Sequence, residues 1–436
     1  MQMINRLITN ARELQEHTVS LRRDFHKYPE CGFMEFRTVS KIVEYLQALG
    51  IDVKYGAEVI AMDKVLGLPD SQSISDARAR AISEGADEKI VNSIPDGGTA
   101  VVATICGTAD ESTTTVAFRF DIDCNEIDES VSLENLAFKK GFASVHQGCA
   151  HACAHDGHIA IGLTLAKVLS ENTDCFSGKV KLIFQPAEEG VRGADAMVAA
   201  GIVDDVDYFF SGHIGIAANR TGDLYTSTDK FLCATKFNAE FFGLSTHAGL
   251  KPEEGKNALL AAAQAALSLH SISRHSGGAS RINVGVISGG TGRNVIPSYA
   301  QIQFETRGID STVSSFMKKR AETVISASAM MYDVESSLKC VGNAESFVPC
   351  EDFGEELYEL AAGTGIYENV YPKGSMNASE DCTSFMNRVT ERGGKATYMM
   401  FGSDLASQHH TPEFDFDEKT MTDAVALLAI VAAKYA

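Results

Sequence analysis

The stretch His146-Gln-Gly-Cys149-Ala-His151-Ala-Cys153-Ala-His155-Asp156-Gly157-His158 contains four of the 12 histidines and two of the 10 cysteines of this chain. His151, Cys153 and His155 stand at every second position, so on an extended strand they would share one face. Thiolate and imidazole groups side by side are ligands that suit a borderline transition metal. The stretch therefore predicts a metal site, and its remaining ligands have to come from elsewhere in the chain.

A closed structural zinc site is an alternative for the same stretch. Such sites are usually completed by four nitrogen or sulfur ligands, with cysteines paired at short spacing. Cys149 and Cys153 fit that spacing loosely. Acidic candidates at other positions would favour a catalytic site instead.

Length and composition limit the class of protein. A chain of 436 residues is too long for one ordinary core, which predicts two domains. The net charge of −20 and a pI near 5.0 argue against binding to nucleic acid or to anionic membranes. The N-terminal segment lacks the apolar core of a signal peptide, and no apolar run approaches the roughly 20 residues of a membrane span. We expect a cytoplasmic protein whose scattered cysteines are mostly reduced core residues.

Most of the chain alternates between strand-like and helical segments. This pattern predicts an α/β domain, formed by residues 1–228 and 345–436, with a mostly parallel central sheet flanked by helices. The expected strands are 100–105, 115–120, 179–185, 206–212 and 396–401, and the expected helices are 4–27, 36–49, 158–171, 192–201 and 418–435, with a helix-prone stretch at 70–93.

Residues 229–344 have a different pattern. They predict a strand-helix-strand-strand-helix-strand order, which is typical of a small α+β unit of ferredoxin-like type inserted into the larger domain. Its strands are expected at 236–242, 281–288, 299–306 and 334–341, and its helices at 257–272 and 312–331.

Residues with useful chemistry follow the expected strands of the larger domain. Ligands of open α/β sheets gather at the carboxyl ends of the strands, so these residues are predicted to meet. Taken alone, a pair of adjacent glutamates is more typical of a solvated helix start. The candidates are Asp121 and Asp123, Glu188 and Glu189, and His213, to which His409 and His410 are added near the C-terminus.

Several motifs together resemble the amidohydrolase branch of the aminoacylase/carboxypeptidase metallopeptidases. The resemblance covers essentially the whole chain and implies a two-metal peptidase domain, with zinc or manganese as the divalent ions, and an inserted lid that also dimerises. The expected partner is an identical chain or a paralogous subunit. The motifs are Arg22-Arg-Asp-Phe-His26, Pro29-Glu30, Glu35-Phe-Arg-Thr38, Phe118-Arg-Phe-Asp-Ile-Asp123, His151–His158, Phe184-Gln-Pro-Ala-Glu-Glu-Gly190 and His410-x-x-x-Phe414.

The resemblance also implies roles by position. Glu188 matches the general acid/base and Asp121 an acidic residue that orients a ligand, while His151 and His158 match positions without a ligand role. Cys149 is then interpreted as a buried thiol. Ala154 stands where the family usually has Gly, and we expect a φ below zero there. The five positions that match metal ligands are Cys153, His155, Glu189, His213 and His410.

Three residues of the inserted unit match positions that contact substrate. Taken alone, each is more typical of a structural residue. In family members the residue matching His247 reaches across the dimer to hydrogen-bond the developing oxyanion. In related glutamate-releasing carboxypeptidases, residues matching Asn294 and Arg307 hold the carboxylates of the substrate. A planar guanidinium binds a carboxylate with two parallel hydrogen bonds, which supports the assignment of Arg307.

Within the branch, Met62–Asp70, the stretch that follows and Lys251–Gln264 are similar to proteins that cleave p-aminobenzoyl-glutamate to p-aminobenzoate and glutamate. The expected activity is hydrolysis of this N-acyl-glutamate. One alternative is another N-acyl-amino-acid or dipeptide hydrolase of the same family. An alternative of another class is a metal-binding, non-catalytic subunit of a heteromeric hydrolase.

Overall fold

The chain folds into two compact units in this computed structural model, which describes residues 2–109 and 112–436. Unit 1 comprises Met1–Asp229, Phe347–Met376 and Asp381–Ala436, and unit 2 comprises Lys230–Ser346 and Asn377–Glu380. The sequence pattern assigns 377–380 to the larger domain, but these residues belong to unit 2. The reason is backbone pairing, because the N–H of Asn377 donates to the carbonyl of Lys230 at 3.1 Å.

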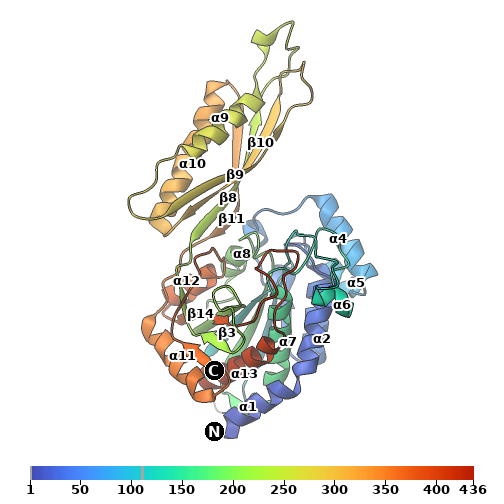
Figure 1. Cartoon of the computed structure of the whole chain (residues 1–436), viewed down its shortest axis with the longest axis vertical. Coiled ribbons are helices and arrows are strands. Elements are labelled where there is room, and N and C mark those ends of the chain that lie inside the picture. Colours follow the sequence, from blue (N-terminus) through green and yellow to red (C-terminus); the bar gives the residue numbers. More distant parts are fainter. Residues whose placement is uncertain (1, 110–111) are drawn as a thin grey trace. The chain divides into compact units, whose positions relative to one another are not determined.

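An eight-stranded mixed sheet forms the centre of unit 1 (Figure 1). Its four central strands, β4, β3, β5 and β14, run parallel, which confirms the mostly parallel sheet, and antiparallel pairs occur toward both edges. Every residue of β3 is buried, as expected for a strand covered on both faces. In spatial order the strands are β1 (Asp52–Tyr55), β2 (Val101–Cys106), β4 (Lys179–Gln185), β3 (Thr115–Asp121), β5 (Tyr208–Ile214), β14 (Lys395–Phe401), β6 (Asp223–Tyr225) and β12 (Asn369–Tyr371).

Helices α1, α2, α7 and α13 pack together beside this sheet, with α7 almost entirely buried (Figure 1). The single helix expected at 4–27 is two helices, because the chain leaves helical geometry at Leu14. The helices of unit 1 are α1 (Gln2–Glu13), α2 (Gln15–Lys27), α3 (Phe36–Ala48), α4 (Ser71–Ser83), α5 (Glu88–Ser93), α6 (Leu136–Lys140), α7 (His155–Ser170), α8 (Ala194–Ala199), α11 (Glu351–Thr364), α12 (Thr383–Glu391) and α13 (Lys419–Tyr435); β7 (Thr228–Asp229) and β13 (Gly374–Ser375) form a separate small sheet.

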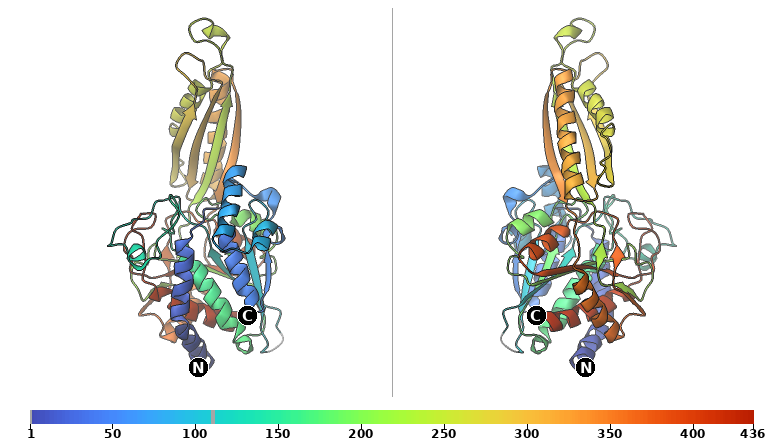
Figure 2. Two further views of the ribbon diagram at one scale, coloured as in Figure 1. Left: turned by 90° about the vertical axis from the view of Figure 1, so that its right-hand side faces the viewer. Right: turned by 90° about the vertical axis from the view of Figure 1, so that its left-hand side faces the viewer.

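Unit 2 has the predicted β-α-β-β-α-β order. Its four strands are antiparallel in the order β11-β8-β10-β9, and both helices pack on one face of the sheet (Figure 2). Alternate residues of β8 and β10, among them Phe237, Phe241 and Ile302, are buried against the alanines of α9. The elements are β8 (Cys233–Phe242), α9 (Ala258–His270), β9 (Ser280–Gly289), β10 (Tyr299–Gly308), α10 (Ser311–Met331) and β11 (Glu335–Ala344).

Two shifts in element boundaries bear on the metal site. Helix α7 begins at His155 and not at residue 158, so the segment from His151 to His155 is not an extended strand. Strand β5 continues to Ile214, so His213 lies inside the strand and does not follow it. Within the described ranges, none of the helices has the length and apolar character needed to span a bilayer.

Candidate metal centre

The candidate ligands of unit 1 come together where the parallel strands end. Glu188 and Glu189 follow β4, and His213 is near the end of β5. β3 ends at Asp121 between these two strands, and β14 leads into the loop that carries His410. The last residues of two strands and the loops after two others therefore meet at one edge of the sheet, at the carboxyl ends of four neighbouring parallel strands.

Between Cys153 and His155 lies Ala154, whose backbone adopts the left-handed conformation. Ala154 has φ +66°, which corrects the expected φ below zero. For a residue with a Cβ this conformation costs about 1–2 kcal/mol, and it explains why Gly is the usual residue in the family. The sharp bend lets Cys153 end one segment while His155 begins α7. The two ligands are thus brought together by a turn and not by strand alternation.

His155 presents one ring nitrogen to the protein and the other to the centre of the site. Its Nδ1 donates to the main-chain oxygen of Asp123 at 2.9 Å. Its buried Nε2 has no hydrogen-bond partner among the described residues, and it lies 3.8 Å from Glu189 Oε1 and 3.9 Å from Glu188 Oε2. Burial lowers the pKa of His155, but the surrounding carboxylates, led by Asp121, raise it to about 10. Without a metal, the proton on Nε2 therefore balances the negative charge of these carboxylates; a bound cation would replace that proton and take the lone pair of Nε2.

Two more histidines face the sulfur of Cys153. The Nε2 atoms of His213 and His410 lie 3.4 Å and 3.3 Å from its Sγ. Nδ1 of His213 donates to the main-chain oxygen of Ile214 at 2.7 Å, which leaves the Nε2 lone pair directed at Cys153. Burial holds the pKa of His213 well below its usual value, so this imidazole is neutral, as a metal ligand must be.

The glutamate pair lies in a turn and not at a helix start, because α8 begins only at Ala194. The N–H of Glu189 donates to Asp123 Oδ2 at 3.0 Å, and Glu189 Oε2 lies 3.4 Å from His410 Nε2. Burial raises the pKa of Glu189, but His410 and His155 lower it to about 2, so the carboxylate is charged. The carboxylate of its neighbour Glu188 also faces His155, with 3.9 Å between Oε2 and Nε2.

Asp121, the last residue of β3, and Asp123, two residues later, contact different histidines. Asp121 accepts hydrogen bonds from His158 Nδ1 at 2.5 Å and Arg119 Nη1 at 2.7 Å, and only its longer 3.7 Å contact reaches His155. Nε2 of His158 accepts the N–H of Ile214 at 3.0 Å, so both nitrogens of His158 are used and it is not a free ligand. The residue that orients His155 is Asp123, through its main-chain oxygen.

Two residues near the ligands differ from the sequence-based interpretation. Asp123 was a candidate from its place after a strand, but the resemblance gave it no role, and the structure shows that its main-chain oxygen accepts the hydrogen bond of His155. Cys149 was interpreted as a buried thiol, but it is partly exposed and groups with Cys31 and Cys124, whereas Cys153 groups with histidines and Glu189. A closed structural zinc site built on Cys149 and Cys153 is therefore wrong.

The donor set fits a divalent metal centre. One thiol, three imidazole nitrogens and one carboxylate are the groups that zinc binds, and imidazole and carboxylate also suit manganese. The orphaned Nε2 of His155 shows that the protein itself does not satisfy this set. We call these five residues the ligand cluster: Cys153, His155, Glu189, His213 and His410.

In unit 2 the structure separates the three predicted substrate residues. His247 and Asn294 are exposed on adjacent loops, where His247 pairs with Val295 and the N–H of Ala248 donates to the carbonyl of Asn294 at 3.0 Å. These loops adjoin the Tyr299 end of β10, whereas Arg307 is at its other end. Arg307 is partly exposed and pairs with Glu305, with 2.8 Å between Nε and Oε1.

The chain is similar to known proteins over nearly its whole length. Residues 117–434 match the sequence profile of peptidase family M20/M25/M40. The indole-3-acetyl-aspartic acid hydrolase of Enterobacter agglomerans is 45% identical over 97% of both chains. One of the subunits of p-aminobenzoyl-glutamate hydrolase from Escherichia coli K12 is 41% identical over 100% of this chain and 99% of its own. A crystal structure of an aminobenzoyl-glutamate utilization protein from Klebsiella pneumoniae is 40% identical, with a TM-score of 0.82 over 97% of both chains.

Proposed function

Because this chain belongs to peptidase family M20/M25/M40 and is a metal-dependent hydrolase of amide bonds, we propose that its substrate is p-aminobenzoyl-glutamate. The products would be p-aminobenzoate and glutamate. Two full-length relatives named for aminobenzoyl-glutamate support this choice of acyl group and amino acid. A cytoplasmic location remains part of the proposal.

The observation that carries the catalytic part is the convergence of Glu188 with the ligand cluster. Glu188 Oε2 and Glu189 Oε1 approach the same orphaned nitrogen of His155 at 3.9 Å and 3.8 Å. A non-catalytic, metal-binding subunit would need the ligands but would have no use for a second carboxylate at that place. The complete set therefore favours a catalytic chain.

We propose that the ligand cluster holds two divalent ions, zinc or manganese, with Cys153 between the two histidines that face it. Such ions supply Lewis acidity, which lowers the pKa of water and polarises the carbonyl of the amide. The cysteine sulfur favours zinc, while the carboxylate and imidazoles also accept manganese. Metal analysis of the purified chain decides between them.

Glu188 is the proposed general base and acid. Its carboxylate takes a proton from the attacking water and delivers that proton to the departing nitrogen of glutamate. Glu189, held by His410 and by the N–H hydrogen bond to Asp123, stays in place as a ligand while its neighbour moves the proton. Proton transfer of this kind typically accelerates a reaction by about 10²- to 10⁴-fold.

His247, Asn294 and Arg307 are proposed to bind substrate in an assembly of two chains. The N–H of Gly249 donates to Nδ1 of His247 at 3.1 Å, so the neutral ring carries its proton on Nε2 and can donate it to an oxyanion. The ten residues of β10 place Arg307 about 30 Å from the loops of His247 and Asn294. One substrate can therefore meet all three only if His247 and Asn294 come from one chain and Arg307 from the other. The partner is an identical chain or a paralogous subunit.

Indole-3-acetyl-aspartate is the second candidate substrate, because a relative named for its hydrolysis is 45% identical over nearly the whole chain. Both candidates are aromatic acyl groups joined to an acidic amino acid. In both cases the amide bond of the substrate has to lie at the metal centre, and a cationic side chain has to bind the side-chain carboxylate of the amino acid.

The experiment is a comparison of kcat/KM for both substrates with the chain purified alone and loaded with zinc or manganese. We expect higher kcat/KM for p-aminobenzoyl-glutamate. A higher kcat/KM for indole-3-acetyl-aspartate would make that compound the proposed substrate, while amide hydrolysis would remain the reaction. No release of amino acid from either substrate at full metal content would contradict catalysis by this chain alone and would favour a non-catalytic subunit.

A further inference from the structure

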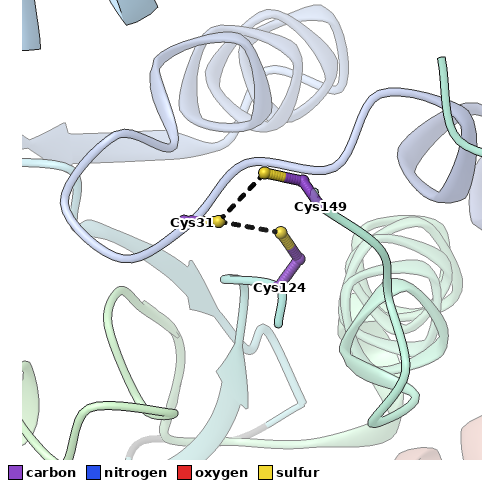
Figure 3. A group of neighbouring side chains, drawn as sticks. All are labelled: Cys31, Cys124 and Cys149. Carbon is purple, nitrogen blue, oxygen red and sulfur yellow. Dashed lines mark hydrogen bonds between the residues drawn. The ribbon is translucent and has the colours of Figure 1, made fainter. Parts of the chain in front are cut away.

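Three cysteines outside the ligand cluster lie against one another in unit 1. Sγ of Cys31 is 3.5 Å from Sγ of Cys124 and 3.3 Å from Sγ of Cys149, and Figure 3 shows the three side chains pointing toward one another. They come from three segments far apart in the sequence: the loop after α2, the segment after β3 and the start of the histidine-rich stretch. We call Cys31, Cys124 and Cys149 the thiol cluster.

Backbone hydrogen bonds hold these three segments side by side. Cys31 and Cys124 form a parallel β-bridge, and the N–H of Cys124 donates to the carbonyl of Glu30 at 3.0 Å. Asn125 and Ala150 exchange two hydrogen bonds of 3.0 Å and 3.1 Å. The sulfurs are thus assembled by the fold, without a ligand having to pull them together.

The distances between the sulfurs fit a shared metal ion better than a disulfide. A disulfide bond is about 2.05 Å long, well below both distances. Two sulfurs bound to one tetrahedral zinc ion at about 2.3 Å lie about 3.8 Å apart. The thiol cluster needs to open by only a few tenths of an ångström to admit such an ion.

Charge and access support the same conclusion. Hydrogen bonds from Cys124 and Cys31 lower the pKa of Cys149 to about 3 despite its burial, with help from Arg80 and His146. The hydrogen bond with Cys124 lowers the pKa of Cys31, but the hydrogen bond with Cys149 and burial raise it above its usual value, and burial raises the pKa of Cys124. One thiol of the three is therefore already a thiolate, and the other two lose their protons to solvent when an ion binds. Nε of Arg80 is buried without a hydrogen-bond partner among the residues that the structure describes. Three thiolates and a divalent ion carry one net negative charge, which the guanidinium of Arg80 balances. Cys149 is partly exposed, so an ion can enter from its side.

We propose that Cys31, Cys124 and Cys149 bind a thiophilic metal ion, zinc or a similar closed-shell cation, through three thiolates. This site is separate from the ligand cluster and does not depend on the proposed substrate. Cys124 follows Asp123, which orients His155, and Cys149 lies four residues before Cys153. An ion in the thiol cluster would therefore brace both segments that position the catalytic metal centre.

The test is a cadmium titration that follows the thiolate-to-cadmium charge-transfer absorption. The variant Cys153→Ser removes the only thiol of the ligand cluster, so the absorption that remains reports the thiol cluster. We expect Cys153→Ser to keep most of the absorption, and a second change, Cys149→Ser, to weaken the apparent cadmium affinity at least about tenfold. The matched control is Cys233→Ser in the same background, because Cys233 is a buried thiol of unit 2.

A second measurement needs no variant. The full-length wild-type chain is alkylated with and without zinc, and its cysteines are quantified in peptides by mass spectrometry. Zinc should protect Cys31, Cys124 and Cys149 together, while the exposed Cys106 and Cys350 react equally under both conditions. Equal reaction of the thiol cluster with and without zinc, or a Cys31–Cys149 disulfide in the freshly purified protein, would overturn the proposal.

Discussion

The ligand cluster of unit 1 and the substrate residues of unit 2 differ in how the fold holds them. Cys153, His155 and His213 are buried, and each of these two histidines has its Nδ1 fixed by a main-chain oxygen, while His410 is the exposed member of the cluster. His247 and Asn294 are exposed on loops. The first set is ready to bind metal before substrate arrives.

The difference shows which part of the site one chain can complete. The ligand cluster lies within one unit, at the ends of adjacent strands, so its geometry follows from a single sheet. The residues proposed to bind substrate lie toward opposite ends of another sheet. We infer that metal binding is a property of the single chain, whereas substrate binding depends on assembly.

The change Glu188→Gln is the strongest test of this division. It removes the proposed base but keeps the shape of the side chain, so kcat should fall about 10²- to 10⁴-fold while metal content is unchanged. Turnover and metal content are measured on the same preparation. Near wild-type kcat with full metal would show that another group moves the proton.

His247→Ala should have the next largest effect. Loss of one oxyanion donor typically lowers kcat about 10²- to 10³-fold, and metal content should stay at the wild-type value. Mixing this variant with Glu188→Gln tests whether the site is shared between two chains. In a mixed dimer, one shared site would contain Glu188 from one chain and His247 from the other, and activity would return. If the mixture stays inactive although mixed dimers form, His247 acts within its own chain.

Arg307→Ala should raise KM for p-aminobenzoyl-glutamate about 10- to 100-fold, because a charged hydrogen bond to the carboxylate is lost. The matched substrate is p-aminobenzoyl-glutamine, which lacks the side-chain carboxylate. Glu305 pairs with Arg307 in the free chain, so Glu305→Gln serves as a control that leaves the cation in place. Equal losses on both substrates would remove Arg307 from carboxylate binding.

The smallest expected effect is on stability and concerns the residues around the ligand cluster. Burial lowers the pKa of His26, but its hydrogen bonds with Asp156 at 2.8 Å and Glu129 at 3.0 Å raise it to about 9. The folded state therefore binds this proton more tightly than the unfolded state, whose pKa is about 6.5. The stabilisation is complete below about pH 6.5 and is lost as the pH rises to 9, by about 1–3 kcal/mol. Urea unfolding at these two pH values measures it, and His26→Gln should remove this part of the pH dependence.

Much of the fold could be predicted from the sequence because hydrophobic patterns are local. β4 has the bounds that its sequence pattern predicts, and the order of elements in unit 2 follows from alternating periods. The short strands β1, β6 and β12 were missed, because three or four residues carry too little pattern. The alternation of His151, Cys153 and His155 does not mark a strand, because alternation of residue types does not distinguish a strand from a turn that leads into a helix.

The sequence by itself determined which residue types are present, their order along the chain and the resemblance that assigns Glu188 and the ligand cluster. Only the tertiary structure decided how they are used. In the structure, Ala154 adopts the left-handed conformation and a main-chain oxygen of Asp123 orients His155. Cys149 belongs to a different cluster from Cys153. The physical reason is that hydrogen bonds and sulfur contacts join residues far apart in the chain, and spacing along the sequence does not encode them.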